Sequence, residues 1–284
     1  MPETEPNLCA HPPASSRGVY LYCFARPAAA GQIAAPGVDD DTEVAALTVE
    51  GVAAVFSPVS LETFSGPSGT ANLHDLSWIV PRARRHEQVV EAVMQLSPVL
   101  PARFGTVLSS AATLERLTAR NAGKIRGFLE QMADREEWSV KAFVDVPKAE
   151  AWLLASQAAL EAVPERGPVS PGLRYIHVRR FHVHARRQLE EWSRRTAAEV
   201  QQSLAAHAVD FCLLRLQSQE APVKDQKLVL HCALLVLKDR VVEWRERATE
   251  IEARYADRGL SLSICGPWPP YSFCPSLLDG EPRE

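Results

Sequence analysis

The chain has 284 residues, of which 46% are hydrophobic and 23% are charged, and it carries a net charge of −4. This composition is ordinary for a protein with a buried core, and the length suits two small domains or one large one. The negative net charge gives no sign of a polyanionic partner, so any basic surface has to be local. We see no secretory signal, and no apolar run approaches the roughly 18 residues that a membrane span needs. We therefore expect a soluble, cytoplasmic protein.

Six cysteines are scattered along the chain without a CxxC motif. Cys212 and Cys232 lie inside apolar runs, where free cysteine is commonly buried. We therefore expect reduced thiols, as in a protein of a reducing compartment.

The N-terminal half alternates strand-like and helix-like segments. Residues 1–17 are rich in Pro, Ser and Glu, and we expect them to be disordered. Residues 18–25 are β-prone and nearly all apolar, which is typical of a strand covered on both faces. Residues 44–59 contain two apolar runs separated by Glu50 and Gly51, which predicts a β-hairpin.

Two amphipathic helices and a further strand follow. From Trp78 onward the apolar residues recur at helical spacing, and Pro81 suits the first helical turn, where its missing N–H costs nothing. Ser109 or Ser110 is placed to cap a second helix. The alternation within 138–144 then predicts a strand, although the apolar Phe143 breaks the pattern.

This order of elements predicts an α+β protein with two domains. Strands interrupted by helices that cover one face of a sheet fit a modified ferredoxin-like sandwich with an extra strand, which we assign to residues 18–146. Residues 147–172 hold a short helix and a linker rich in Pro and Gly. We assign residues 173–275 to a second α+β domain and residues 276–284 to a tail.

The second domain combines a pair of long helices with three strands. Two heptad seams indicate that the helices pack as an antiparallel, coiled-coil-like pair. Strongly apolar segments at 210–217, 227–238 and 260–265 predict the strands. The seam residues are Tyr175, Val178, His182, Ala185, Leu189, Trp192, Thr196 and Val200 in the first helix and Val241, Trp244, Ala248, Ile251 and Tyr255 in the second.

Three histidines, His177, His182 and His184, lie close together in the sequence. On a helix, His182 points roughly 140–160° away from the other two, and His177 and His184 stand about 10.5 Å apart along the axis. That arrangement cannot hold one ion without ligands from a further element. We therefore expect a packed core histidine rather than a metal site.

Six arginines form three pairs along the first long helix. Their spacing of seven and eight residues places them on nearly one flank of the helix, beside the seam. A solvated face supported by neighbouring glutamates explains this stripe, and a docking surface for an acidic protein is the functional alternative. The acidic net charge argues against nucleic acid as the partner. The pairs are Arg179 and Arg180, Arg186 and Arg187, and Arg194 and Arg195.

The sequence carries no recognisable catalytic motif. It has no GxSxG elbow, P-loop, GxGxxG fingerprint or HExxH helix, and no pair of carboxylates stands out for acid–base chemistry. We therefore expect a non-enzymatic protein without catalytic residues or cofactor. An enzyme on a ferredoxin-like scaffold, a fold that hosts many functions, is the alternative.

Two segments exceed what core patterning requires. Leu100–Val107 places Pro, Arg and Gly between a helix and a strand, and Gly266–Phe273 carries three prolines within four positions. The prolines hold the second segment extended. Its aromatic residues Trp268 and Tyr271 therefore either pack on the domain or are offered to a partner as anchors.

These two segments resemble the GvpL/GvpF family of gas vesicle proteins. The matching motifs are VLPARFGTV at Val99–Val107, EWSVKAFVD at Glu137–Asp145 and the closing motif GPWPPYSF at Gly266–Phe273, which is the most specific. The opening VYLYCFA strand and the stretch Asp75–Val93 also match the layout of the family. The resemblance covers residues 18–274.

The resemblance implies a modified ferredoxin-like N-terminal domain, a C-terminal α+β domain with paired helices, and a role in forming the gas vesicle, a hollow, protein-walled organelle of the cytoplasm. It also implies contact with the small hydrophobic shell protein and with other accessory gas vesicle proteins. It brings no catalytic residue, metal or cofactor, and we expect neither nucleic acid nor a membrane among the partners. A soluble protein that holds the shell subunit would keep its apolar surface from aggregating.

Overall fold

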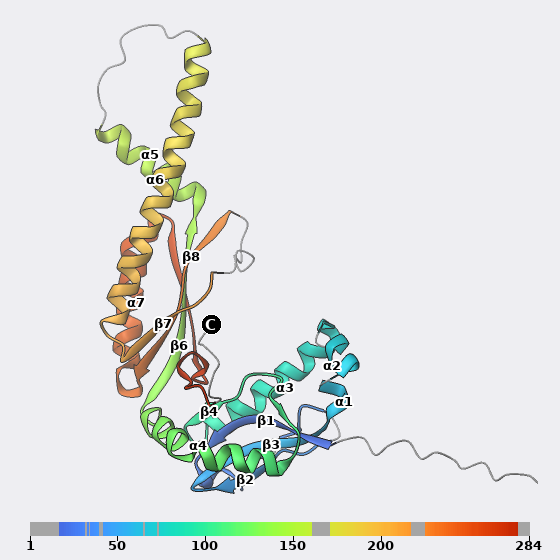
Figure 1. The fold of residues 1–284 in the computed structure, drawn as a ribbon. Helices are drawn as coiled ribbons and strands as arrows, with labels where there is room; N and C mark the ends of the chain where they lie inside the picture. The colour runs from blue at the N-terminus through green and yellow to red at the C-terminus, as the bar shows by residue number, and fades with distance from the viewer. Residues whose placement is uncertain are drawn as a thin grey trace, which may run out of the picture. The chain divides into compact units, whose positions relative to one another are not determined.

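The computed structural model describes residues 17–31, 33, 35–39, 42–64, 66–72, 74–160, 171–216 and 225–277, without the side chains of 66–68, 157–160 and 171–185. The chain forms two compact units, Met1–Ala133 with Pro269–Glu284 and Asp134–Trp268. The mixture of helices and antiparallel strands confirms the predicted α+β class (Figure 1).

The first unit holds a sheet in which every strand pair is antiparallel, with the order β2-β3-β1-β4 and with β5 also paired to β1. Its elements are β1 (Arg17–Ala25), η1 (Pro27–Ala29), β2 (Ala45–Val49), β3 (Val52–Ser60), α1 (Leu61–Phe64), α2 (Gly66–Asn72), α3 (Leu76–Met94), β4 (Val99–Pro101), β5 (Val107–Leu108), α4 (Ala111–Gln131) and η3 (Tyr271–Phe273).

Strand β1 is buried on both faces, as its apolar sequence predicts. Tyr20 and Tyr22 belong to the core cluster that α3 covers, whereas Leu21 and Phe24 line the side on which α4 lies. The register shift between Leu21 and Cys23 marks a β-bulge in this alternation. The two long helices therefore cover opposite faces of the sheet (Figure 1), and the expectation that both cover one face is wrong.

The local signals in this unit are mostly confirmed. Glu50 and Gly51 both have positive φ, 48° and 75°, as the two-residue turn of a hairpin requires. Ser110 caps α4 by accepting a hydrogen bond from the Thr113 N–H at 3.2 Å. The predicted start of α3 is wrong, because Asp75 caps the helix and Pro81 lies inside it. An interior proline removes one hydrogen bond of the helix.

The second unit is built on a four-stranded antiparallel sheet with the order β7-β8-β6-β9. Its elements are β6 (Arg135–Asp145), α5 (Val146–Leu160), α6 (Pro171–Ala205), β7 (Asp210–Leu213), β8 (Gln226–Leu237), η2 (Lys238–Arg240), α7 (Val241–Ala256) and β9 (Leu260–Trp268).

Helices α6 and α7 pack on one face of this sheet and on each other in antiparallel orientation, which confirms the predicted helical pair (Figure 1). The Tyr255 hydroxyl donates to Glu199 at 2.5 Å across the pair. Leu189, Trp192 and Val200 of the predicted seam are buried, and the side chains of its first four positions lie outside the described part of the chain. The seam therefore fills a core shared with the sheet rather than a free coiled coil.

Strand β6 joins the second sheet, whereas we assigned its residues to the first domain. It lies between β8 and β9, with Val140 opposite both Cys232 and Ile264. The structural boundary therefore falls after Ala133, not at residue 146, and the chain returns to the first unit at Pro269. Strand pairing is nonlocal, so element order alone does not say which sheet takes a strand. The predicted linker 164–172 is largely outside the described residues, as is most of the predicted tail 1–17.

No helix among the described residues is both long and apolar enough to span a membrane.

Candidate interaction surfaces

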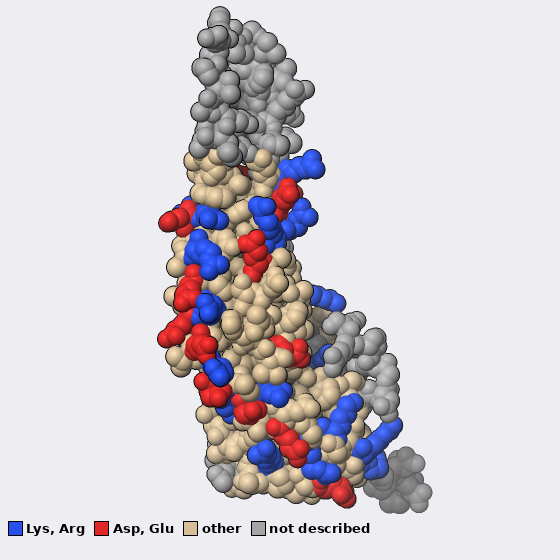
Figure 2. All heavy atoms as spheres, turned by 90° about the vertical axis from the view of Figure 1, so that its left-hand side faces the viewer, with Lys and Arg blue, Asp and Glu red and all other residues tan. Residues whose placement is uncertain are grey.

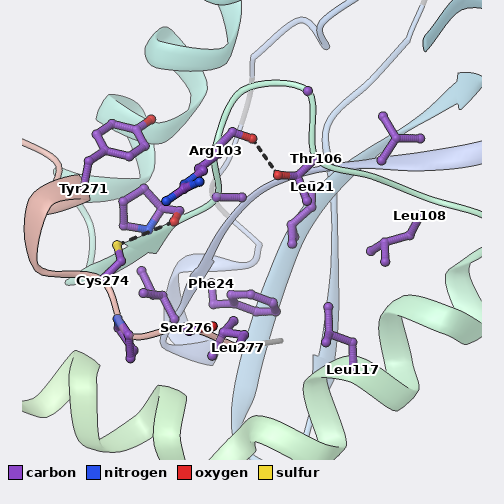
Figure 3. Close-up of a pocket in the computed structure, with 16 residues that line it drawn as sticks. Leu21, Phe24, Arg103, Thr106, Leu108, Leu117, Tyr271, Cys274, Ser276 and Leu277 are labelled. Carbon is purple, nitrogen blue, oxygen red and sulfur yellow. Dashed lines mark hydrogen bonds between the residues drawn. The ribbon is translucent and has the colours of Figure 1, made fainter. Parts of the chain in front are cut away.

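A cavity of about 440 Å³ opens in the first unit (Figure 3). The side chains of Leu21 and Phe24 form part of its wall on the sheet, and Leu117 contributes from α4. The remaining walls are residues 100–108, which run from β4 through the connecting loop into β5, and the segment 274–277. The pocket thus brings together residues 274–277, which follow the closing motif, and the first of the two segments that the sequence singled out.

The loop wall of the pocket is fixed by hydrogen bonds of its main chain. Gly105 adopts a φ of 83°, and its N–H donates to the Tyr20 hydroxyl at 3.0 Å. The Thr106 carbonyl accepts from Leu21 N at 2.9 Å, and the Thr106 hydroxyl donates to the Arg103 carbonyl at 2.6 Å. These bonds hold the loop in place and leave the Arg103 side chain exposed at the pocket.

The closing motif is anchored by Tyr271, whose hydroxyl lies 3.1 Å from His86 Nε2 and donates to Glu87 at 2.9 Å. His86 Nδ1 in turn lies 3.0 Å from the Tyr20 hydroxyl. All of these bonds are satisfied when His86 carries its proton on Nε2 and accepts at Nδ1 from Tyr20. A continuous chain of hydrogen bonds therefore joins Gly105 in the pocket wall to the closing motif.

Burial perturbs the titration of this network. It lowers the pKa of His86 to about 4, because the charged imidazolium is poorly solvated there. It also raises the pKa of Tyr271, to which the neighbouring Glu87 adds, and it raises the pKa of Glu87 itself. The network therefore holds a neutral histidine at neutral pH.

We expect the first unit to lose about 3 kcal/mol of stability as the pH falls from 6.5 to about 4 because of His86. The folded pKa lies below the unfolded value, so the unfolded chain takes up the proton first and stability declines through that window. Urea unfolding followed at several pH values measures this slope.

The pH dependence of stability is compared between the wild type and His86→Gln. Because Glu87 titrates in both proteins, the difference between the two slopes reports His86 alone. The exposed His74→Gln is the matched control and should keep the wild-type slope. An unchanged slope in His86→Gln would contradict the assignment.

The arginine stripe is only partly described. Arg186, Arg187, Arg194 and Arg195 are exposed on α6, whereas the side chains of Arg179 and Arg180 lie outside the described part of the chain. Acidic and basic side chains are interspersed on the face shown in Figure 2 rather than gathered by sign. Such a mixed surface is unlike the basic patch of a nucleic-acid-binding protein.

The two aromatic candidates of the closing motif differ in exposure. Trp268 ends β9 with 41% of its surface exposed. Tyr271 is half-buried and held by His86 and Glu87 within the first unit, as described above. Of the two, the geometry leaves Trp268 open to a partner.

The three histidines of α6 have side chains outside the described region. Elsewhere in the described chain, no group of three His, Cys, Asp or Glu residues is arranged to hold a metal ion.

Sequence reasoning missed an apolar row along β7 and its flanks. Val209, Phe211, Leu213 and Leu216 expose 44%, 43%, 58% and 54% of their surface. Phe211 lies opposite Leu234, and Leu213 opposite Cys232, both of which are buried. Phe211 and Leu213 therefore lie on the same face of the sheet as the core, at the edge that α6 and α7 leave uncovered. The apolar pattern was visible in the sequence, but it did not say that β7 is an edge strand.

Strand β7 has a hydrogen-bonded neighbour on one side only within the described sheet. The Asp210 carboxylate accepts from the Phe211 N–H at 2.8 Å, which occupies one of the edge amides. A charged residue that caps its own edge in this way discourages further strand pairing. The side chains of the row, more than its main chain, are therefore available for contact.

The family model described as "Gas vesicle synthesis protein GvpL/GvpF" matches residues 18–275. The chain is 27% identical over 206 residues to gas vesicle protein L of Streptomyces sp., a match that covers 72% of each chain. It is 25% identical over 282 residues to gas vesicle protein L2 of Halobacterium salinarum, which covers 95% of each.

Two solved structures share the fold. The crystal structure of gas vesicle protein GvpF from Anabaena sp. PCC7120 superposes with a TM-score of 0.65 at 18% identity and covers 95% of this chain and all of its own. The GvpF structure from Microcystis aeruginosa gives a TM-score of 0.61 at 18% identity, with 91% of this chain and 99% of its own covered.

Proposed function

The chain belongs to the gas vesicle synthesis protein family GvpL/GvpF, and from that premise we propose that it binds the hydrophobic shell protein during gas vesicle assembly. Membership of the family supports a role in assembly and association with gas vesicle proteins. We further propose that the protein acts in the cytoplasm at the growing vesicle and catalyses no reaction.

The observation that carries the proposal is the apolar row Val209, Phe211, Leu213 and Leu216. Four of the large apolar side chains that the second unit exposes fall in one stretch of eight residues, 209–216, at an edge of the sheet. Exposed apolar surface associates with other apolar surface, because the contact removes both from water. A hydrophobic shell subunit matches such a row better than it matches the mixed charges of α6.

Co-expression with the shell protein tests the proposal. We expect the accessory protein to raise the soluble fraction of the shell protein and to co-purify with it. If the shell protein stays insoluble and none of it is recovered with the tagged chain, binding of the shell subunit is contradicted.

The exposed arginines of α6 are proposed to dock other accessory gas vesicle proteins. We expect the fourfold change Arg186→Glu, Arg187→Glu, Arg194→Glu and Arg195→Glu to reduce the recovery of those proteins about tenfold while shell binding persists. Exposed charges mostly steer association, so raised salt should weaken the wild-type interaction in the same direction. Quantitative mass spectrometry of pull-downs measures both effects. Equal recovery from the wild type and the variant would assign the stripe to solvation alone.

A further inference from the structure

We infer that the pocket of the first unit is a peptide-binding site that takes a leucine flanked by acidic residues, supplied by another protein. This site is separate from the β7 row and does not depend on binding of the shell protein. Three observations support this site: the shape of the pocket, its charge, and the way residues 274–277 lie along it.

The pocket has the size and lining of a ligand site. Its volume of about 440 Å³ falls within the range of pockets that bind small ligands or side-chain anchors. Apolar side chains come from β1, α4, β4 and β5, namely Leu21, Phe24, Leu117, Leu100 and Leu108. A branched aliphatic anchor such as leucine is the chemistry that this lining fits.

The charge at the pocket has one sign. Arg103 is the one charged residue among the described lining residues, and none of them is acidic. On α4, Arg120 and Lys124 are exposed and lie three and seven residues after Leu117. At about 100° per residue, both fall within roughly 60° of Leu117 on the helix. An aliphatic anchor flanked by carboxylates therefore matches this site in both shape and charge.

The chain itself shows how an extended segment lies there. Lys124 Nζ donates to the carbonyl of Ser276, and Leu277 contributes to the pocket wall. Tyr271 and Cys274 hold the start of this segment, the latter through a contact of 3.8 Å from its sulfur to the Pro101 carbonyl. Lys124 thus already binds a peptide carbonyl at the edge of the cavity.

The chain also offers a probe of suitable chemistry, because residues 276–281 have the sequence SLLDGE. We would titrate a fluorescein-labelled peptide of this sequence into the full-length protein and follow its anisotropy. We expect saturable binding, and about tenfold weaker binding of the amide counterpart SLLNGQ.

Two variants of the full chain test the assignment to the pocket. Arg103→Glu reverses the charge at the rim, and Leu117→Trp fills the cavity. Each should weaken binding of the peptide about tenfold or more. Arg84→Glu, an exposed charge reversal on α3, is the matched control and should bind as the wild type does. Thermal unfolding followed by circular dichroism checks that each variant is folded.

Leu278→Asp places a charge in the chain's own SLLDGE segment and so tests whether that segment competes with the labelled peptide for the pocket. Three results would overturn the inference. The first is no saturable binding of the labelled peptide to the wild type or to Leu278→Asp. The second is binding that Arg103→Glu and Leu117→Trp leave unchanged although both are folded. The third is binding that appears only in Leu278→Asp, which would assign the pocket to the chain's own C-terminal residues rather than to another protein.

Discussion

Replacing Trp244 by alanine is expected to lower the free energy of unfolding of the second unit by about 3–5 kcal/mol. Trp244 is 1% exposed and packs against Trp138 with ring centroids 6.1 Å apart, in the core where α7 meets the sheet. Removing the indole leaves a cavity that the sheet and α6 cannot close. Hydrogen exchange of the β8 amides, read by mass spectrometry, reports the loss in this unit separately from the first.

Trp244→Phe is the matched variant. Within the described structure, Trp244 Nε1 is buried and has no hydrogen-bond partner, so phenylalanine removes an unsatisfied donor along with part of the volume. We expect a cost of about 1 kcal/mol, well below that of alanine. If Trp244→Phe lowers the free energy of unfolding as much as Trp244→Ala does, the indole N–H has a partner, and lost packing does not account for the cost of the alanine substitution.

The double change Phe211→Asp and Leu213→Asp is expected to abolish solubilisation of the shell protein in co-expression. Both side chains are about half exposed, so the fold should lose about 1 kcal/mol or less. Two carboxylates in the row would have to be desolvated against an apolar partner, which costs several kcal/mol and removes the driving force for contact. The measurement is the soluble fraction of the shell protein, compared with wild-type co-expression.

Val242→Asp is the control for this prediction. Val242 is 70% exposed on α7 in the same unit, outside the β7 row, so its change adds a charge without touching the proposed contact. It should leave the shell protein soluble. If Val242→Asp and the β7 double variant act alike, the effect is one of general surface charge, and the row is not the binding site.

Local signals in the sequence were enough to predict most elements of this fold. The apolar run of β1 indicated a strand with both faces covered because its neighbouring side chains point to opposite sides, and the structure places a helix on each. The heptad seam of α7 placed Trp244 and Ile251 in the core for the same kind of reason. Phe143 interrupted the expected alternation of β6 because it is buried on the opposite face of that sheet from Val140 and Val144.

What escaped prediction depends on contacts between distant residues. The pairing of β6 with β8 joins residues about 90 positions apart, and no local pattern specifies it. Likewise, Tyr271 contacts His86 across 185 positions of sequence. The sequence alone therefore left open whether Tyr271 packs on its own domain or is offered to a partner. The β7 row escaped because an edge strand and a central strand have the same apolar pattern until the sheet order is known.

The most direct test of the account is a pull-down of the tagged protein from cells that carry the complete gas vesicle gene set, with mass spectrometry of the recovered proteins. The wild type is expected to bring down the shell protein, and the Phe211→Asp, Leu213→Asp variant is expected to bring down at least tenfold less of it. If neither tagged protein recovers any shell protein from cells that are shown to contain vesicles, binding of the shell subunit is contradicted. Equal recovery of the shell protein by the wild type and the variant would show that the shell protein binds, but not through the β7 row.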